Sequence, residues 1–237
     1  MSLTRPAHRP TVQEIVSALE DRSRVASDRA ALGTESTATA EAPGETSLRA
    51  RLERHVPADA KEAGDLTEML AFLDRHPDPF DRGILEGHFT GSAVVVSAAG
   101  DRVLLLRHRK LDRWLQPGGH AEPGEREGGM VALREAREET GIEGLVLHPS
   151  APRPLDVDVH PIPARGDESA HRHLDLRYLV VAPPHGTARL AAEEARALRW
   201  FIWEELSTVD LDTGLRRAFR AARAFTSTPL AEEESVR

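Results

Sequence analysis

Three glutamates at helical spacing are the residues of this sequence best suited to chemistry. Glu135, Glu138 and Glu139 stand at positions i, i+3 and i+4 of a segment that predicts a helix over about Met130 to Thr140. Their carboxylates would therefore project from one face of the helix, where like charges repel each other. No lysine or arginine at the matching positions cancels all three charges. A hard divalent cation with oxygen ligands, such as Mg²⁺, neutralises such a group, so we expect a metal site on this helix.

The segment before this helix is rich in glycine. It reads Pro117-Gly118-Gly119-His120-Ala121-Glu122-Pro123-Gly124-Glu125. Because glycine has no Cβ, the backbone here can approach a ligand or a metal closely, and its carbonyls are candidate ligands. A solvated acidic helix behind an ordinary glycine turn is the alternative interpretation of the helix taken alone.

Loop and helix together resemble the signature of the Nudix hydrolases. That signature is a glycine, five residues, a glutamate, seven residues, and then Arg-Glu, an apolar residue, any residue, Glu-Glu, any residue, a glycine and an apolar residue. Gly119 and Glu125 match its first half, and the segment from Arg134 to Ile142 matches its second half throughout. Eight residues separate Glu125 from Arg134, one more than the signature has at this place. The pair Gly128-Gly129 predicts that the extra residue is absorbed in the loop before the helix begins.

The resemblance implies a fold and an activity. The fold is an α/β/α sandwich with a mixed sheet over residues 88–226. The activity is hydrolysis of a phosphoanhydride bond in a nucleoside diphosphate linked to another group. ADP-ribose, nucleotide sugars and nucleoside triphosphates belong to this substrate class, and no residue pattern separates them. The implied cofactor is Mg²⁺ or Mn²⁺.

The same resemblance assigns roles within the motif. The implied metal ligands are Glu135, Glu138 and Glu139 with the carbonyl of Gly118. The implied catalytic residues are these glutamates, Arg134, which orients them, and Glu125 as the partner of Arg134. Glu138 is the first choice for the carboxylate that accepts a proton from the attacking water, and Glu193 or Glu194, outside the motif, is the rival.

Two other functions are compatible with this fold. A non-catalytic Nudix-like module that binds a ligand or regulates another protein is expected where the metal-binding glutamates are lost, and here they are present. An isomerase similar to isopentenyl diphosphate isomerase uses a catalytic cysteine, and this chain has none. The sequence therefore favours a hydrolase.

Two groups of residues outside the motif are predicted to contact the substrate. Arg107, Arg109 and Lys110 form a basic cluster suited to a second phosphate. His171 and His173 begin an alternating pattern that gives one strand a wholly polar face, and this face is expected to line the substrate cleft. Exposure of that face to solvent and zinc binding by the His-x-His pair are the alternatives.

Hydrophobic periodicity predicts the elements that position these residues. A β-hairpin is expected over residues 92–107, further strands over residues 154–160, 173–181 and 197–203, and a last helix after Asp212. Residues 1–87 are expected to form a loosely attached helical extension, with a flexible linker over about residues 26–46. A helix from Thr11 to Leu19 in this extension is a candidate homodimer contact. Residues 88–226 would form the Nudix domain and residues 227–237 a flexible tail.

Composition narrows the functional classes. The chain has 237 residues, no cysteine and a formal net charge of −8. The lack of cysteine excludes thiolate zinc sites and cysteine nucleophiles. The negative charge argues against nucleic acid or an anionic membrane as a partner, and no apolar run is long enough to span a bilayer. We therefore expect a cytoplasmic protein whose partner is a small nucleotide-type diphosphate.

Overall fold

The computed structural model describes residues 47–149, 151–166, 168–190 and 195–226. Several expectations fall outside these residues. They are the helix from Thr11 to Leu19 with its dimer contact, the linker at about residues 26–46, the tail at residues 227–237, and the rival bases Glu193 and Glu194.

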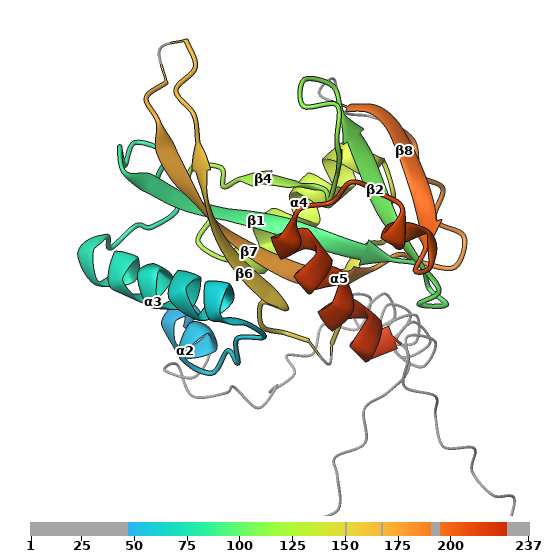
Figure 1. The fold of residues 1–237 in the computed structure, drawn as a ribbon, viewed down its shortest axis with the longest axis horizontal. Helices are drawn as coiled ribbons and strands as arrows, with labels where there is room; N and C mark the ends of the chain where they lie inside the picture. Colours follow the sequence, from blue (N-terminus) through green and yellow to red (C-terminus); the bar gives the residue numbers. More distant parts are fainter. Residues whose placement is uncertain (1–46, 150, 167, 191–194, 227–237) are drawn as a thin grey trace, which may run out of the picture.

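A mixed sheet forms the centre of the molecule (Figure 1). Its central strand β1 is parallel to β7 and antiparallel to β2 and β4, while β6 and β8 extend the sheet from β7 and β2. The strands are β1 (Gly87–Val96), β2 (Arg102–His108), β3 (Trp114–Leu115), β4 (Gly118–His120), β5 (Val146–Leu147), β6 (Asp156–Ile162), β7 (His171–Val181) and β8 (Ala195–Ile202). The expected hairpin and the three further expected strands are therefore confirmed.

Helices cover both faces of this sheet, as expected for an α/β/α sandwich (Figure 1). On one face, α2 (Leu48–Glu53), α3 (Ala60–Arg75) and α4 (Gly128–Thr140) contribute to a core with the odd-numbered residues of β1. On the other face, α5 (Thr213–Thr226) and the 3-10 turn η1 (Glu205–Ser207) pack on a second core with the even-numbered residues Val94 and Val96. The alternation of side chains along a strand explains why one strand supplies both cores.

Helix α4 lies close to β1 because glycines face each other at their contact. A Cβ on Gly91 would lie only 2.5 Å from the carbonyl oxygen of Gly128. Gly128 and Gly129 therefore belong to the first turn of α4, and the expectation that this pair forms loop before the helix is wrong. Glu125 stays in the loop itself. The helix ends at Gly141, whose φ of 62° is the left-handed conformation that suits glycine.

Helices α2 and α3 are packed into the first core, although a loose attachment was expected. Leu52, Met69 and Phe72 are fully buried in the same core as Phe89 of β1. The carboxylate of Glu62 on α3 accepts a hydrogen bond of 3.1 Å from the backbone N–H of Val157 on β6. Among the described helices, none is both long and apolar enough to cross a membrane.

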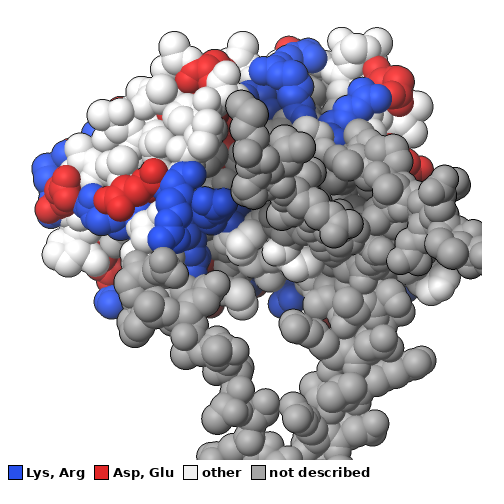
Figure 2. Space-filling model, turned by 90° about the horizontal axis from the view of Figure 1, so that it is seen from below, with Lys and Arg blue, Asp and Glu red and all other residues white. Residues whose placement is uncertain are grey.

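Charges of both signs share the surface. On the face seen in Figure 2, the Lys and Arg side chains of the described residues lie beside Asp and Glu side chains. Exposed ion pairs such as Arg49–Asp74, with 2.5 Å between nitrogen and oxygen, and Arg126–Asp78, at 3.3 Å, are of this kind.

Candidate active site

Strand β4 carries the glycines of the motif to the glutamates of α4. Gly119 lies so close to the helix that a Cβ on it would be 2.7 Å from the carboxyl carbon of Glu135. The backbone N–H of Gly118 donates a hydrogen bond of 3.0 Å to the carboxylate of Glu139. Pairing of β4 with β1, in which Gly119 is opposite Gly91, holds both glycines in place. The two halves of the motif therefore form one site.

Arg134 is the centre of the polar contacts in this site. Its Nε and Nη2 donate to the carboxylate of Glu125, with the shortest distance 2.9 Å. Its Nη1 donates to Glu135 at 3.0 Å and to Glu138 at 3.1 Å. Nη2 also donates to the backbone carbonyl of His120 at 2.7 Å. Arg134 thus neutralises part of the acidic cluster and joins it to β4 and to the loop.

The carboxylates around Arg134 differ in their electrostatics. The hydrogen bond from Arg134 lowers the pKa of Glu125, so Glu125 stays ionised. Burial raises the pKa of Glu135, although Arg134 opposes this effect. The side chain of Glu138 is 56% exposed, which leaves it accessible to a substrate or a water molecule.

The three glutamates of α4 fit a hard divalent cation in chemistry. Their donors are oxygens, and the missing side chain of Gly119 lets the backbone of β4 lie directly beside Glu135. Their carboxylates are not gathered around one point, since Glu138 is bonded to Arg134 and Glu139 to the N–H of Gly118. Binding of one cation would therefore require these carboxylates to turn toward it.

The basic cluster lies in a different part of the sheet. Arg107 donates to Asp112 at 2.9 Å and lies over the ring of Trp114. It lines a hollow of about 350 Å³ together with Phe201, which belongs to the core beneath α5. Arg109 donates to the backbone carbonyl of Ala195 at 3.4 Å. Arg107 and Arg109 thus contact residues of β3, of β8 and of the turn between β2 and β3. None of these contacts involves Arg134 or the glutamates of α4.

The backbone N–H of Lys110 donates to His108 Nδ1 at 3.3 Å, in the turn that follows β2.

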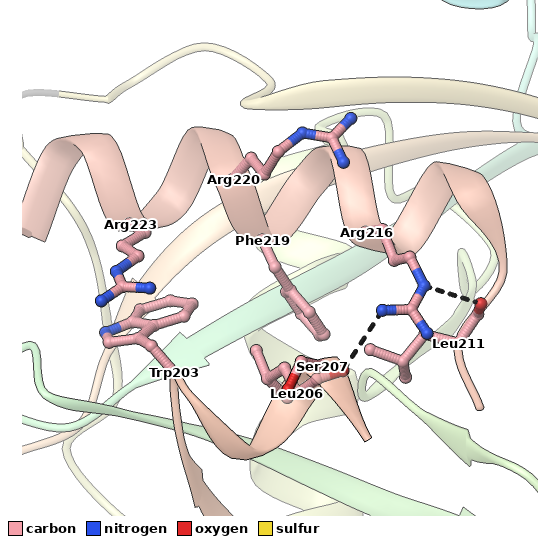
Figure 3. Close-up of a pocket in the computed structure, with 8 residues that line it drawn as sticks. All are labelled: Trp203, Leu206, Ser207, Leu211, Arg216, Phe219, Arg220 and Arg223. Carbon is pink, nitrogen blue, oxygen red and sulfur yellow. Dashed lines mark hydrogen bonds between the residues drawn. The ribbon is translucent and has the colours of Figure 1, made fainter. Parts of the chain in front are cut away.

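A second hollow, of about 160 Å³, lies between α5 and η1 (Figure 3). Its guanidinium groups come from α5, and Arg216 uses its own to donate to the backbone carbonyls of Leu206 and Leu211. Trp203 closes one side of the hollow, and its indole N–H donates to the carbonyl of Gly100 at 2.8 Å. None of the motif residues lines this hollow.

The polar face of β7 is largely internal. Arg177 is buried and contacts Asp156 at 2.9 Å, Asp158 at 3.3 Å and Asp175 at 3.0 Å. Asp175 also accepts hydrogen bonds from the hydroxyls of Thr90 and Ser92. Solvent exposure, the alternative considered for this face, is therefore wrong for Asp175 and Arg177.

Five histidines gather on the same face, at the N-terminal end of β7. His171 is buried and His173 is half-buried, and the structure adds three members that sequence reasoning missed: His88 from β1, His120 from β4 and His160 from β6. The ring of His173 lies 4.8 to 5.6 Å, centroid to centroid, from the other four. The His-x-His spacing was the local signal, but the parallel register that places His88 beside His173 joins residues far apart in the chain.

Residues 87–222 match the family model described as NUDIX domain. A NUDIX-family hydrolase from Clostridium perfringens is 26% identical, with 58% of this chain and 97% of that chain covered and a TM-score of 0.43. An Ap4A hydrolase from C. elegans is 22% identical, with 58% and 96% covered and a TM-score of 0.44. The NUDIX domain of Shewanella oneidensis NrtR, solved with ADP ribose, is 14% identical, with 65% and 96% covered and a TM-score of 0.42.

Proposed function

The chain belongs to the NUDIX domain family, and we propose that it is a Nudix pyrophosphohydrolase, which hydrolyses a phosphoanhydride bond in a nucleoside diphosphate linked to another group, with Mg²⁺ or Mn²⁺ as cofactor. The contact between β4 and α4 carries this proposal. Gly119 lies against Glu135, and the N–H of Gly118 donates to Glu139, so the glycine backbone lies directly beside the carboxylate oxygens. Such a set of oxygens suits a hard cation that is shared with the phosphates of a substrate.

Each motif residue has a distinct task in this proposal. Glu135, Glu138 and Glu139 hold the cation with the carbonyl of Gly118. The cation, when bound, neutralises phosphate charge and lowers the pKa of the attacking water. Glu138 accepts the proton of that water, because its carboxylate is the exposed one. Arg134 is a positioning residue, since it fixes Glu135 and Glu138 while Glu125 fixes Arg134 in turn.

The substitution Glu138→Gln tests this assignment. It keeps the size of the side chain but removes the proton acceptor and one anionic ligand, so turnover should fall by at least about 100-fold. Glu143→Gln is the matched control, because Glu143 is an exposed glutamate just beyond the end of the same helix. Steady-state rates at saturating Mg²⁺ and far-UV circular dichroism are measured for both variants. Near-native turnover of Glu138→Gln would remove Glu138 from the mechanism.

A substrate panel identifies the scissile bond. ADP-ribose, a nucleotide sugar, a nucleoside triphosphate and Ap4A are assayed with Mg²⁺, with Mn²⁺ and with a chelator, and product masses are recorded in ¹⁸O-labelled water. Hydrolysis of a phosphoanhydride that stops on chelation is the expected result. Binding of a panel member in calorimetry without turnover in either metal would instead favour the non-catalytic, ligand-binding module.

A further inference from the structure

The histidine cluster brings ring nitrogens from three strands close together. His88, His171 and His173 each offer a nitrogen, and these three atoms all lie within 4.8 Å of one another. Among the residues that the structure describes, this is the one group of three or more His, Cys, Asp or Glu side chains with this property. His120 adds a fourth nitrogen, since its Nε2 lies 3.0 Å from Nε2 of His173.

Several of these nitrogens are buried without a protein partner. His88 is 2% exposed, and neither of its ring nitrogens has a hydrogen bond. Nε2 of His171 is also buried without a hydrogen bond. Because native proteins rarely leave buried polar atoms unsatisfied, at a cost of about 1–3 kcal/mol each, these clustered nitrogens are available to bind a ligand.

One ring of the cluster already has an outer hydrogen-bond partner of the kind that orients a metal-binding histidine. Nδ1 of His171 lies 2.9 Å from the carbonyl oxygen of Ser169. A carbonyl only accepts, so this ring carries its proton on Nδ1 and turns the lone pair of Nε2 toward the cluster. A backbone carbonyl in this position commonly orients a metal-binding histidine.

We propose that His88, His171 and His173, with His120 as the fourth ligand, bind one transition-metal ion such as Zn²⁺ at a site separate from the glutamates of α4. Imidazole nitrogens suit Zn²⁺, whereas Mg²⁺ prefers oxygen. The 3.0 Å between Nε2 of His120 and Nε2 of His173 is close to the roughly 3.3 Å edge of a tetrahedron with metal–nitrogen distances of about 2.0–2.1 Å. The carboxylate of Glu168, 3.8 Å from Nε2 of His171, places a negative charge beside the ion.

The position of this ion gives it a structural task. It would join β1, β4 and β7, which supply the four rings. Strand β4 has only three residues, and His120 follows directly on Gly119, which faces Glu135. The backbone carbonyl of His120 also accepts a hydrogen bond from Arg134. The ion would therefore fix the strand on whose opposite face the glutamates of α4 lie.

Metal titration of the full chain tests the proposal. The metal-free protein is titrated with Zn²⁺ by calorimetry in a large excess of Mg²⁺, which occupies oxygen sites. Co²⁺ serves as the optical probe, because tetrahedral nitrogen coordination gives it strong visible absorption. We expect one equivalent of Zn²⁺ to bind, Co²⁺ to give the tetrahedral spectrum, and Zn²⁺ to abolish that spectrum. Absence of Zn²⁺ uptake by the wild-type protein would overturn the proposal.

Matched variants locate the ion. His173→Gln and His120→Gln affect half-buried rings and should each weaken Zn²⁺ binding by at least about 100-fold, the upper end of the loss known for outer-shell partners. His148→Gln is the control, because His148 is also buried with both nitrogens unsatisfied but packs against Phe225, away from the cluster. Circular dichroism of each metal-free variant verifies the fold.

The pair Glu135→Gln and Glu138→Gln, combined in one chain, separates the two metal sites. Its Zn²⁺ affinity in excess Mg²⁺ should match that of the wild type. Loss of Zn²⁺ binding in this double variant, or its retention in both histidine variants, would show that the ion is held elsewhere and would refute the proposed site, whatever the outcome of the activity assays.

Discussion

Arg134 organises the candidate active site at the scale of single residues. Its planar guanidinium donates to three carboxylates and one carbonyl at the same time. A lysine ammonium in its place has the charge but not the fork that matches Glu125 through two nitrogens. The cluster of acids thus depends on the shape of this cation as much as on its charge.

Arg134→Lys should therefore reduce kcat/KM by about 10-fold to 100-fold, because one charge-assisted hydrogen bond of about 1.5–3 kcal/mol is lost from the groups that position Glu138. Arg126→Lys is the control, since Arg126 is a mainly exposed arginine in the loop just before α4. Steady-state kinetics and a urea denaturation curve are measured for each. Equal kcat/KM in the two variants would contradict the role of Arg134.

Single residues also show which parts of the candidate sites could be predicted from the sequence. The glutamates and Arg134 could be identified because helical spacing is a local property. His88, the partner of His171 and His173, could not be identified from the sequence. It lies 83 positions before His171, and only the parallel pairing of β1 with β7 brings them together. The strand face that begins with His171 and His173 was expected to line a cleft, but Arg177 on this face is neutralised by Asp156 and Asp158 of another strand.

The contact of β1 with α4 decides the geometry at the scale of elements. Gly91 lets the helix backbone approach the strand, since a Cβ there would meet the carbonyl oxygen of Gly128 at 2.5 Å and the nitrogen of Ala132 at 2.9 Å. Both atoms belong to backbone, which cannot move aside as a side chain can. The close approach holds Glu135 against Gly119.

Gly91→Ala should lower the free energy of unfolding by about 1–3 kcal/mol, as for other overpacked sites. Gly64→Ala should raise it by about 0.5–1 kcal/mol, because Gly64 lies within α3 and a Cβ on it meets nothing within 4 Å. Urea midpoints give both values. Opposite signs support a steric effect at β1, whereas destabilisation by both substitutions would not.

Periodicity predicted most elements, and the exceptions have a physical cause. The hairpin, α4 and α5 follow from alternating or helical patterns within one segment. Gly128 and Gly129 were assigned to a loop because glycine disfavours helices. In the structure a Cβ on Gly128 would meet Leu176 at 2.7 Å, and a Cβ on Gly129 would meet Leu147 at 3.0 Å, so packing on the sheet outweighs propensity.

A buried set of charges links the layers at the scale of the whole molecule. Glu62 of α3 accepts hydrogen bonds from His55 and from the N–H groups of Ala58 and Val157. Arg217 of α5 contacts Asp156 and the carbonyl of Val157. Burial alone would raise the pKa of Glu62, but its three hydrogen bonds hold that pKa below the usual value of 4.5.

The stability that Glu62 contributes should therefore depend on pH. It is complete above about pH 4.5 and is lost as the pH falls through the lowered pKa, because the folded state binds the proton less readily than the unfolded state. At pH 7, Glu62→Gln should reduce the free energy of unfolding by about 3 kcal/mol. The gap between this variant and the wild type should narrow below pH 4.5.

Urea denaturation between pH 7 and pH 3 measures this gap. Glu53→Gln is the control, since its side chain is 54% exposed and pairs only loosely with Arg49, at 3.5 Å. Its effect should stay below about 1 kcal/mol. A gap for Glu62→Gln that is constant over the whole pH range would contradict the proposed charge.

The region that matches the family model is shorter than the region that shares the hydrophobic core. The family match begins at residue 87, yet Met69 and Phe72 fill the interior beside Phe89, and Glu62 satisfies an amide of β6. A fragment that begins at residue 87 would expose this core to solvent and leave the backbone N–H of Val157 without its hydrogen-bond acceptor. Anyone dividing the chain for expression should cut ahead of Ser47, which caps α2, rather than at the border that homology suggests.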